Sequence, residues 1–244
     1  MKPVQPLMSL LRAIAGGDCK RASALIEASP DLARQSASVG ATRTGPGGYF
    51  FSEITLYLYE GDTALHFAAA AYQTDIAKDL ILHGADPGAK NRQGAEPLHY
   101  ASSGVPGSTH WNPAAQAATI TFLIRSGAKP NASDKSGVAP LHRAVRTRCA
   151  AAVQALLEHG ANPRLENGSG SRPLHLAVQN TGRGGSGEAG ARGQQEIIIR
   201  LLIEHGARLT DTDHRGKSVS ASVTSGWIKE LLRRDGHDVQ RQRS

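Results

Sequence analysis

The stretch of sequence that decides the fold is Gly137 to Asn167, GVAPLHRAVRTRCAAAVQALLEHGANPRLEN. Pro140 is expected in the first turn of a short helix, where the missing N–H group of proline costs little. A second helix is predicted from the apolar residues at i, i+3 and i+4 within Val153–Leu157, and Gly160 stands where a left-handed residue ends such a helix. The stretch therefore predicts two helices followed by a hairpin-like loop.

The same pattern recurs three more times along the chain. It begins with GDTALHFAAA at residue 61, GAEPLHYAS at residue 94 and GSRPLHLAV at residue 170. The histidines of the four copies are His66, His99, His142 and His175, and the glycines that close the second helices are Gly84, Gly127, Gly160 and Gly206. The histidines are 33, 43 and 33 residues apart and the glycines 43, 33 and 46. The period is therefore 33, with insertions of 10 and 13 residues inside two repeats.

This period and this recurring sequence motif resemble the ankyrin repeat, strongly over residues 63–209 and weakly at both ends. The resemblance implies an all-α solenoid of stacked helix pairs with β-hairpin-like finger loops, in which the four histidines hydrogen-bond between repeats. The usual Thr-Pro-Leu-His reads Thr-Ala-Leu-His at residues 63–66. Elsewhere Glu96, Ala139 and Arg172 replace the threonine, so its cap-like hydroxyl is lost there.

The repeats divide the chain into segments. We expect a degenerate N-terminal capping repeat at 1–35, an aromatic-rich insertion at 36–60, four ankyrin-like repeats over 61–215, a C-terminal capping repeat at 216–236 and a tail at 237–244. The four repeats are placed at 61–93, 94–136, 137–169 and 170–215, with insertions near 103–113 and 181–193. The capping repeats are expected because each end of a stack has one face without a neighbour.

Composition and charge limit the class of protein. An aromatic content of 5% suits thin helical layers rather than one large core. Cys19 and Cys149 fall in different repeats, which leaves no disulfide framework and no four-cysteine zinc site. No apolar run is long enough for a signal peptide or a membrane span, so we expect a monomeric cytoplasmic protein without membrane contact. The net charge of +7 favours acidic partners or nucleic acid.

The insertion at 36–60 contains five of the eleven aromatic residues of the chain. They are Tyr49, Phe50, Phe51, Tyr57 and Tyr59. Residues 54–59 alternate aliphatic side chains with threonine and tyrosine, which predicts a strand. Two interpretations are open: the insertion folds back as a lid over the first repeats, or it presents an aromatic edge to a partner.

A second candidate site lies where the first helix of a repeat turns into the second. The two insertions and the end of LHRAVRTRC occupy this position in three consecutive repeats, so we expect them to meet in space. The arginine edge is defined as His110, Trp111, Asn112, Arg146, Arg148 and Arg183, with Arg143 close by. Such a basic, partly aromatic cluster suits an acidic peptide, a phosphate or a nucleic-acid backbone.

Structural interpretations of the same residues remain open. The arginines could form a solvated face or pair with acidic residues of neighbouring repeats. Trp111 could pack as a hydrophobic staple on a helix that Asn112 caps and Pro113 begins. The glycine-rich segment around Arg183 could be a flexible linker.

The sequence nominates no catalytic residue, cofactor or metal site. Gly182, Gly184 and Gly187 match GxGxxG, but a dinucleotide fingerprint needs a preceding strand and this segment follows a predicted helix. Neither an HExxH nor a GxSxG motif is present. His83, His159 and His205 precede the closing glycines, where histidine complements the carbonyl groups of a helix end.

The sequence therefore predicts a protein-interaction scaffold rather than an enzyme. We expect it to bind an acidic partner through its finger loops, first helices and arginine edge. The alternatives are an anion or nucleic-acid phosphate binder that uses the same edge and, third, an unrecognised enzyme. Salt dependence would separate the first two, because phosphate-dominated binding weakens steeply with salt.

Overall fold

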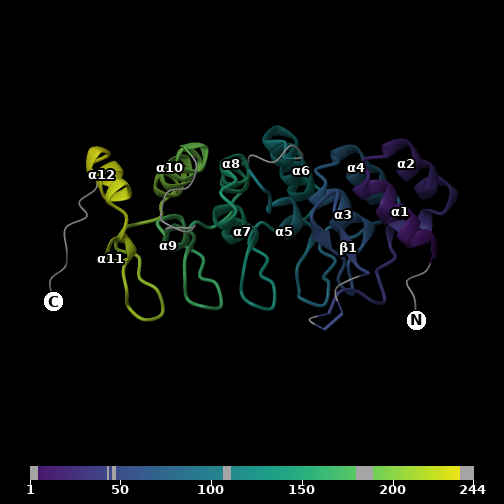
Figure 1. Ribbon diagram of the computed structural model, residues 1–244, viewed down its shortest axis with the longest axis horizontal. Coiled ribbons are helices and arrows are strands. Elements are labelled where there is room, and N and C mark those ends of the chain that lie inside the picture. Colours follow the sequence, from purple (N-terminus) through teal and green to yellow (C-terminus); the bar gives the residue numbers. More distant parts are fainter. Residues whose placement is uncertain (1–4, 43, 46–47, 107–110, 180–188, 237–244) are drawn as a thin grey trace.

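Helix pairs stack along one axis, with the N-terminus at one end and the C-terminus at the other (Figure 1). The structure is a computed structural model that describes residues 5–42, 44–45, 48–106, 111–179 and 189–236. The first helices of the pairs are α1 (Gln5–Ala15), α3 (Ala64–Ala70), α5 (Pro97–Ala101), α7 (Pro140–Arg146), α9 (Pro173–Ala177) and α11 (Val219–Ser222). The second helices are α2 (Cys19–Ala28), α4 (Thr74–Leu82), α6 (Pro113–Arg125), α8 (Ala150–Glu158), α10 (Ala189–Glu204) and α12 (Gly226–Arg234). The predicted all-α ankyrin-type solenoid is confirmed.

Proline and glycine set the limits of the helices as the sequence predicts. Pro97, Pro140 and Pro173 are each the first helical residue of α5, α7 and α9. The glycines that close α4, α6, α8 and α10 all have positive φ, for example 84° at Gly160. A left-handed residue there releases the chain from the helix, and glycine adopts it without a steric penalty.

The core runs through the stack as one continuous layer. Each first helix packs against the first helices on either side of it, and α8 packs against both α6 and α10. Leu65 and Leu98 are fully buried, and Leu141 is 2% exposed. Alanines such as Ala68, Ala101 and Ala144 are also fully buried and allow neighbouring helices to approach closely. No repeat buries its apolar face alone, which explains why the pairs must stack.

The four repeated histidines form a ladder through the stack. The Nδ1 atoms of His66, His99 and His142 accept hydrogen bonds from the backbone N–H groups three residues earlier. Because Nδ1 accepts, the proton lies on Nε2, which donates to a carbonyl group of the next repeat, that of Ala95, Val138 or Ser171. His175 likewise donates through Nε2, to the carbonyl of Lys217. The predicted hydrogen bonds between repeats are confirmed.

The two ends of the stack present polar groups to water. At the N-terminal end, α1 packs on α2 and on the 3-10 helix η1 (Pro30–Ala33). At the C-terminal end, Lys229, Glu230 and Arg233 of α12 are exposed, whereas Ile228 and Leu232 are buried against the stack. Polar side chains on the outer face allow a terminal helix pair to leave that face exposed to water.

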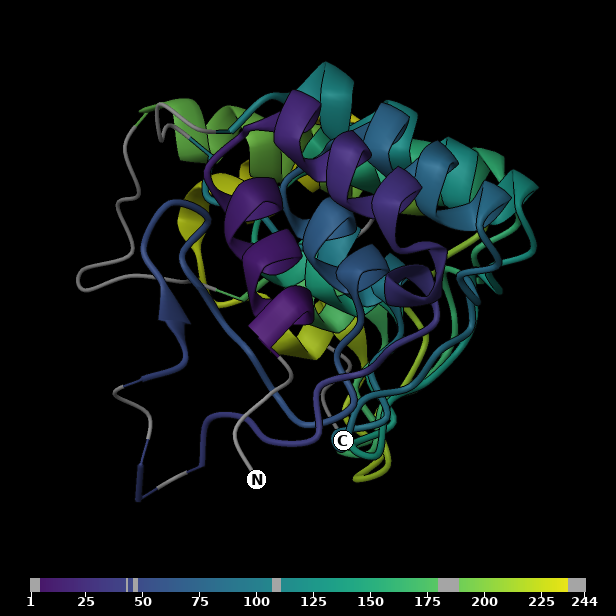
Figure 2. The same cartoon turned by 90° about the vertical axis from the view of Figure 1, so that its right-hand side faces the viewer.

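The aromatic insertion contains a short antiparallel hairpin of β1 (Phe50–Phe51) and β2 (Leu56–Tyr57). The predicted strand over 54–59 is therefore too long, because Thr55, with a φ of 51°, lies in the turn that precedes β2. Figure 2 shows the hairpin projecting on the side of the first helices. Its alternate residues face opposite ways, as in any strand.

One face of the hairpin packs on the stack and the other is exposed. Phe51 is 7% exposed and meets the ring of Phe67 edge-on, with 4.8 Å between ring centroids. On the opposite face, Phe50 is 46% and Tyr57 38% exposed. One face of the hairpin therefore covers the stack, as the lid interpretation expects. The other face leaves two aromatic rings exposed, as the second interpretation expects.

The last residues of the predicted insertion at 181–193 are helical. Residues 189–193 form the start of α10. Glycine lowers helix propensity, which hides this first turn from the sequence pattern. Across the part of the chain that the structure describes, no helix combines the length and apolarity needed to cross a membrane.

Candidate functional site

Arg143, the first of the three clustered arginines, has a structural role. Its Nη2 atom donates to Asp134 at 3.1 Å, and the two side chains are only 17% and 9% exposed. Burial by itself would raise the pKa of Asp134, but the N–H group of Val138, the Arg143 guanidinium and the N–H group of Ser136 together lower it. Arg143 therefore ties α7 to the loop before it, as the pairing interpretation predicts.

Arg146 and Arg148 lie where the arginine edge was expected, at the turn between α7 and α8. Arg146 is exposed. Arg148 is half-buried, has a φ of 59°, and donates through Nη2 to the carbonyl of Gln179, at 3.4 Å. Burial lowers the pKa of its guanidinium. Arg148 therefore joins repeats four and five at this edge, and Arg146 faces solvent beside it.

Trp111 and Asn112 organise the start of α6. The Asn112 side chain accepts a hydrogen bond from the N–H group of Ala115, which is a helix N-cap. Trp111 Nε1 donates to the side chain of Gln116, the fourth helical residue. Trp111 therefore contacts the helix at the position expected for a hydrophobic staple, but through a hydrogen bond instead of an apolar contact. His110 and Arg183, the other two residues of the arginine edge, lie outside the described residues.

A buried contact that the sequence did not predict joins three repeats beneath this edge. A Cβ atom placed on Gly104 would lie 2.8 Å from the Tyr72 hydroxyl, 2.9 Å from Cys149 Sγ and 3.1 Å from Trp111. The Tyr72 hydroxyl also donates to the carbonyl of Ser103. Tyr72 and Arg148 both have positive φ, at equivalent turns of their repeats. The edge is therefore tightly packed around Gly104.

The finger loops share one turn that the sequence shows as a recurring Asn or Asp. A side-chain oxygen of each accepts the backbone N–H groups two and four residues later. The four residues are Asn91, Asp134, Asn167 and Asp213. Consecutive loops are also linked by backbone hydrogen bonds, such as Lys135 N–H to Gln93 O at 2.9 Å. The fingers therefore hold their side chains at fixed repeat spacing.

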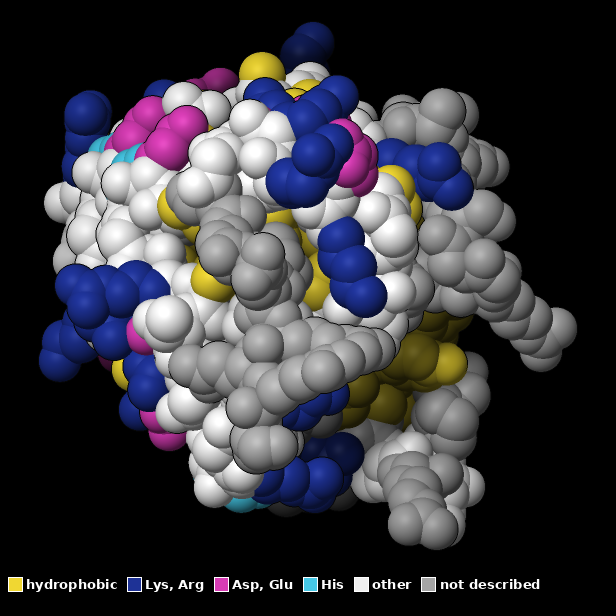
Figure 3. All heavy atoms as spheres, turned by 90° about the vertical axis from the view of Figure 1, so that its left-hand side faces the viewer, with side chains coloured by type: hydrophobic (Ala, Val, Ile, Leu, Met, Phe, Trp, Pro, Cys, Tyr) yellow, Lys and Arg dark blue, Asp and Glu magenta, His cyan; other side chains and the backbone are white. Residues whose placement is uncertain are grey.

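Cations cover the outside of these loops, while three of their six carboxylate side chains, those of Glu96, Asp134 and Asp211, are at most 9% exposed. The finger loops 84–96, 127–139, 160–172 and 206–218 are described throughout. Their exposed cations are Lys90, Arg92, Lys129, Lys135, Arg164, Arg208, Arg215 and Lys217, and their exposed carboxylates are Asp86 and Glu166. Figure 3, a view of the C-terminal end, shows more surface from Lys and Arg than from Asp and Glu.

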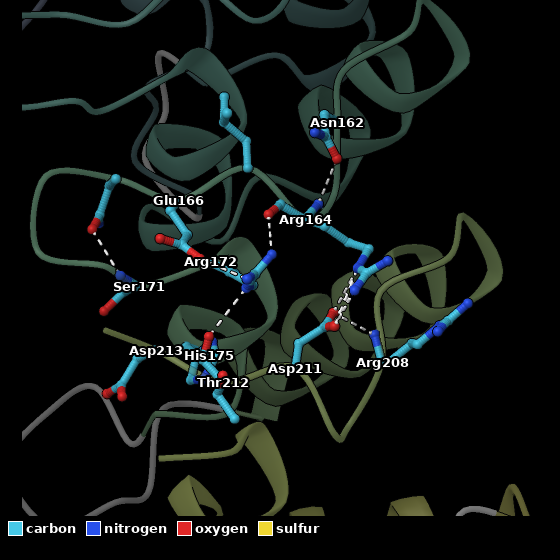
Figure 4. A network of polar contacts seen from close by, with 12 residues as sticks. Asn162, Arg164, Glu166, Ser171, Arg172, His175, Arg208, Asp211, Thr212 and Asp213 are labelled. Atoms are coloured by element: carbon cyan, nitrogen blue, oxygen red, sulfur yellow. Dashed lines mark hydrogen bonds and ion pairs between the residues drawn. The ribbon is translucent and has the colours of Figure 1, made fainter. Parts of the chain in front are cut away.

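Asp211 illustrates how a finger carboxylate turns inward (Figure 4). Both of its oxygens accept hydrogen bonds from Arg164, at 2.7 to 3.1 Å, and Oδ2 also accepts from the N–H group of Arg208. Burial would raise the pKa of Asp211, but these partners lower it. Arg172, from the same loop as Arg164, pairs with Glu166 at 2.6 Å. The network neutralises acidic groups and leaves Arg208 exposed.

The sequence predicts the finger loops as a binding surface, but it did not single out this row of cations along them. A signal was available: Lys129 and Arg208 both stand two residues after the closing glycine, and Arg92 and Lys135 both stand two residues before the next glycine of positive φ. The burial of the intervening carboxylates had no comparable signal. Among the described residues, no group of three or more His, Cys, Asp or Glu side chains could hold a metal ion.

Comparison with known protein families gives two matches. A family model described as ankyrin repeats (3 copies) matches residues 112–213, and one described as ankyrin repeat matches residues 60–92. Together they span more than half of the chain. A search of curated proteins found no match. Ankyrin repeats are generally protein–protein interaction modules, and proteins built from them are typically non-enzymatic scaffolds. On the period, the helix pairs, the histidine ladder and these matches, the chain belongs to the ankyrin repeat family.

Proposed function

We propose that this protein binds an acidic segment of a partner protein along its finger loops and first helices, with Arg146 and Arg148 at the far edge of the same surface. The observation that carries the proposal is the sorting of charge on the fingers. Eight cations are exposed there against two carboxylates, although the loops contain six acidic residues. Asp134 pairs with Arg143, which is not one of the eight, whereas Asp211 offsets the charge of Arg164 alone.

The geometry favours an extended binding partner. The exposed cations belong to four consecutive loops. Backbone hydrogen bonds link the first three loops, and the Arg172 side chain links the third to the fourth through the carbonyl of Thr212. Each cation is in water, so a single pair with a partner carboxylate would stabilise a complex by less than about 1 kcal/mol. A row of them provides attraction and orientation together, and raises the rate of association with an acidic chain.

The experiment is affinity capture from a native lysate of the source organism, with and without nuclease. The finger variant is Lys135→Glu, Arg208→Glu, Arg215→Glu, and the edge variant is Arg146→Glu, Arg148→Glu. The matched control is Lys20→Glu, Arg21→Glu, Lys229→Glu, which changes net charge equally at exposed positions away from the fingers. Circular dichroism and thermal unfolding verify that every variant is folded.

We expect a protein that the intact chain and the control retain, that the finger variant loses, and that nuclease does not release. Capture of nucleic acid would instead favour the phosphate-binding alternative, with a binding constant that falls steeply as salt rises. Equal loss in the finger variant and the control would mean that net charge alone determines capture, and would overturn the proposal.

A further inference from the structure

A hollow lies between the aromatic insertion and the finger loop at 84–96. Its volume is about 400 Å³. It is lined by Ser38, Val39, Gly40, Thr42, Gly45, Tyr49, Glu60 and Arg92. Arg92 belongs to the finger loop at 84–96, and the other lining residues belong to the insertion. The hollow therefore exists because this chain carries an insertion before α3.

Arg92 is held in place on the wall of the hollow. Its Nη2 atom donates to the carbonyl of Ala41 at 2.6 Å, and its guanidinium carbon lies 5.6 Å from the centre of the Tyr59 ring. Its backbone N–H group donates to the carbonyl of Glu60 at 2.8 Å. A guanidinium has five N–H donors, so others remain for a ligand, and a fixed guanidinium suits a carboxylate.

The exposed aromatic pair lies on the same insertion as this hollow. Tyr49 lines the hollow, and the next residue, Phe50, pairs across the hairpin with Tyr57. The two rings lie 4.8 Å apart, centroid to centroid, on the face that does not pack on the stack. Paired exposed aromatic rings are typical anchors of an interface.

We propose that the hairpin and Arg92 form one subsite for an acidic partner segment that also contains an apolar residue. A carboxylate side chain of the partner enters the hollow against Arg92, and a neighbouring apolar side chain packs on Phe50 and Tyr57. This inference rests on the proposed function, because Arg92 is also one of the exposed finger cations. The subsite would distinguish one acidic sequence from another, which a row of exposed charges cannot do by itself.

Glu60 provides an internal check on this assignment. It lines the same hollow, and its exposed carboxylate would repel an incoming carboxylate. Glu60→Gln should therefore tighten binding of an acidic segment. A ligand of any other charge would give no gain or a loss.

The test uses fluorescence anisotropy with a short labelled peptide of Asp and Glu residues that has one Leu at its centre. Two further probes replace that Leu by Ser, or all acidic residues by Asn and Gln. The variants are Arg92→Gln, Arg92→Lys, Glu60→Gln and the double variant Phe50→Ser, Tyr57→Ser. Lys229→Gln and Leu82→Ser are matched controls, because Lys229 is an exposed cation and Leu82 is 81% exposed, both on second helices.

We expect Arg92→Gln to weaken the Leu peptide by about 10-fold, because a charge-assisted hydrogen bond is lost. Arg92→Lys should recover part of this affinity. The double aromatic variant should weaken the Leu peptide by about 10-fold and leave the Ser peptide unchanged, because an apolar contact is lost. Glu60→Gln should strengthen both acidic peptides, and the controls should bind as the intact protein does.

Two other results overturn the inference in different ways. If the finger variant weakens the acidic peptides while the Arg92 and aromatic variants bind as the intact protein does, the proposed function stands and the subsite is wrong. If the intact protein binds the acidic peptides no better than the Asn and Gln peptide, both proposals fail.

Discussion

The finger loops and the arginine edge are both rich in cations, yet they use them differently. At and beside the arginine edge, three arginines fall within six residues. Arg143 pairs with Asp134, and Arg148 donates a hydrogen bond to the carbonyl of Gln179. Along the fingers the cations are far apart in sequence but are all exposed, and some recur at equivalent positions, such as Lys129 and Arg208. Proximity in sequence thus indicates a local structural role here, and recurrence at repeat spacing indicates a surface.

The largest effect should come from removing a carboxylate that the fingers turn inward. Asp134→Ala removes the acceptor of two backbone N–H groups and the partner of Arg143, and we expect a loss of about 3 kcal/mol in the free energy of unfolding. Urea denaturation measures this loss. Asp134→Asn keeps the turn and should cost about 1 kcal/mol. If both variants were as stable as the parent, the inward carboxylates would not support the loops.

The next effect is a loss of stability as the pH falls from 7 to 5. Burial, and then the nearby charge of Arg143, lower the pKa of His99 to about 4, whereas the unfolded chain titrates near 6.5. The unfolded state therefore binds protons first, and His99 alone should cost about 2 kcal/mol at pH 5. The pKa values of His66 and His142 are lowered too, chiefly by burial, and these residues act in the same direction.

Urea denaturation at several pH values measures this slope, and His99→Gln should flatten it. Two buried carboxyl groups act in the opposite direction. Burial raises the pKa values of Asp62 and Glu96, so their protonation favours the folded state as the pH falls. Asp62→Asn removes one of these two opposing groups. A flat profile in that variant would contradict a neutral histidine ladder.

The smallest expected effect is the difference in stability loss between alanine variants of two arginines that are three residues apart. Arg143→Ala leaves Asp134 without its guanidinium and should cost about 1.5 kcal/mol. Arg146→Ala removes an exposed side chain and should cost less than about 0.5 kcal/mol. Thermal unfolding of both variants at one pH makes the comparison. Equal losses would mean that the two arginines do not divide into a structural and a surface residue.

The sequence predicts the helix pairs well, because their determinants are local. A proline at the first helical residue, a histidine three residues after the N-cap and a left-handed glycine act within one repeat. The arginine edge could not be resolved in the same way. Whether Arg143 faces water depends on Asp134, nine residues earlier. The turn of the finger loop places the Asp134 carboxylate within hydrogen-bond distance of Arg143. Asp134 reads from sequence as an exposed loop residue.

The hairpin shows the same limit on a smaller scale. Alternation over residues 54–59 predicts extended chain but does not locate the turn, which Thr55 enters with positive φ. It also cannot distinguish the packed face from the exposed one, because both carry aromatic rings. That distinction depends on Phe67, which belongs to α3 and meets Phe51 edge-on.

The histidine ladder is weaker at its last rung. None of the described groups donates to the buried Nδ1 atom of His175, in contrast to the other three histidines. In a linear array, stability is the sum of each repeat and its coupling to its neighbours. The missing hydrogen bond lies inside the repeat that contains α9, because Nε2 of His175 still donates to Lys217 of the next repeat. Of the four repeats, this one therefore lacks a contact that stabilises the other three, and local opening of the stack should cost least there.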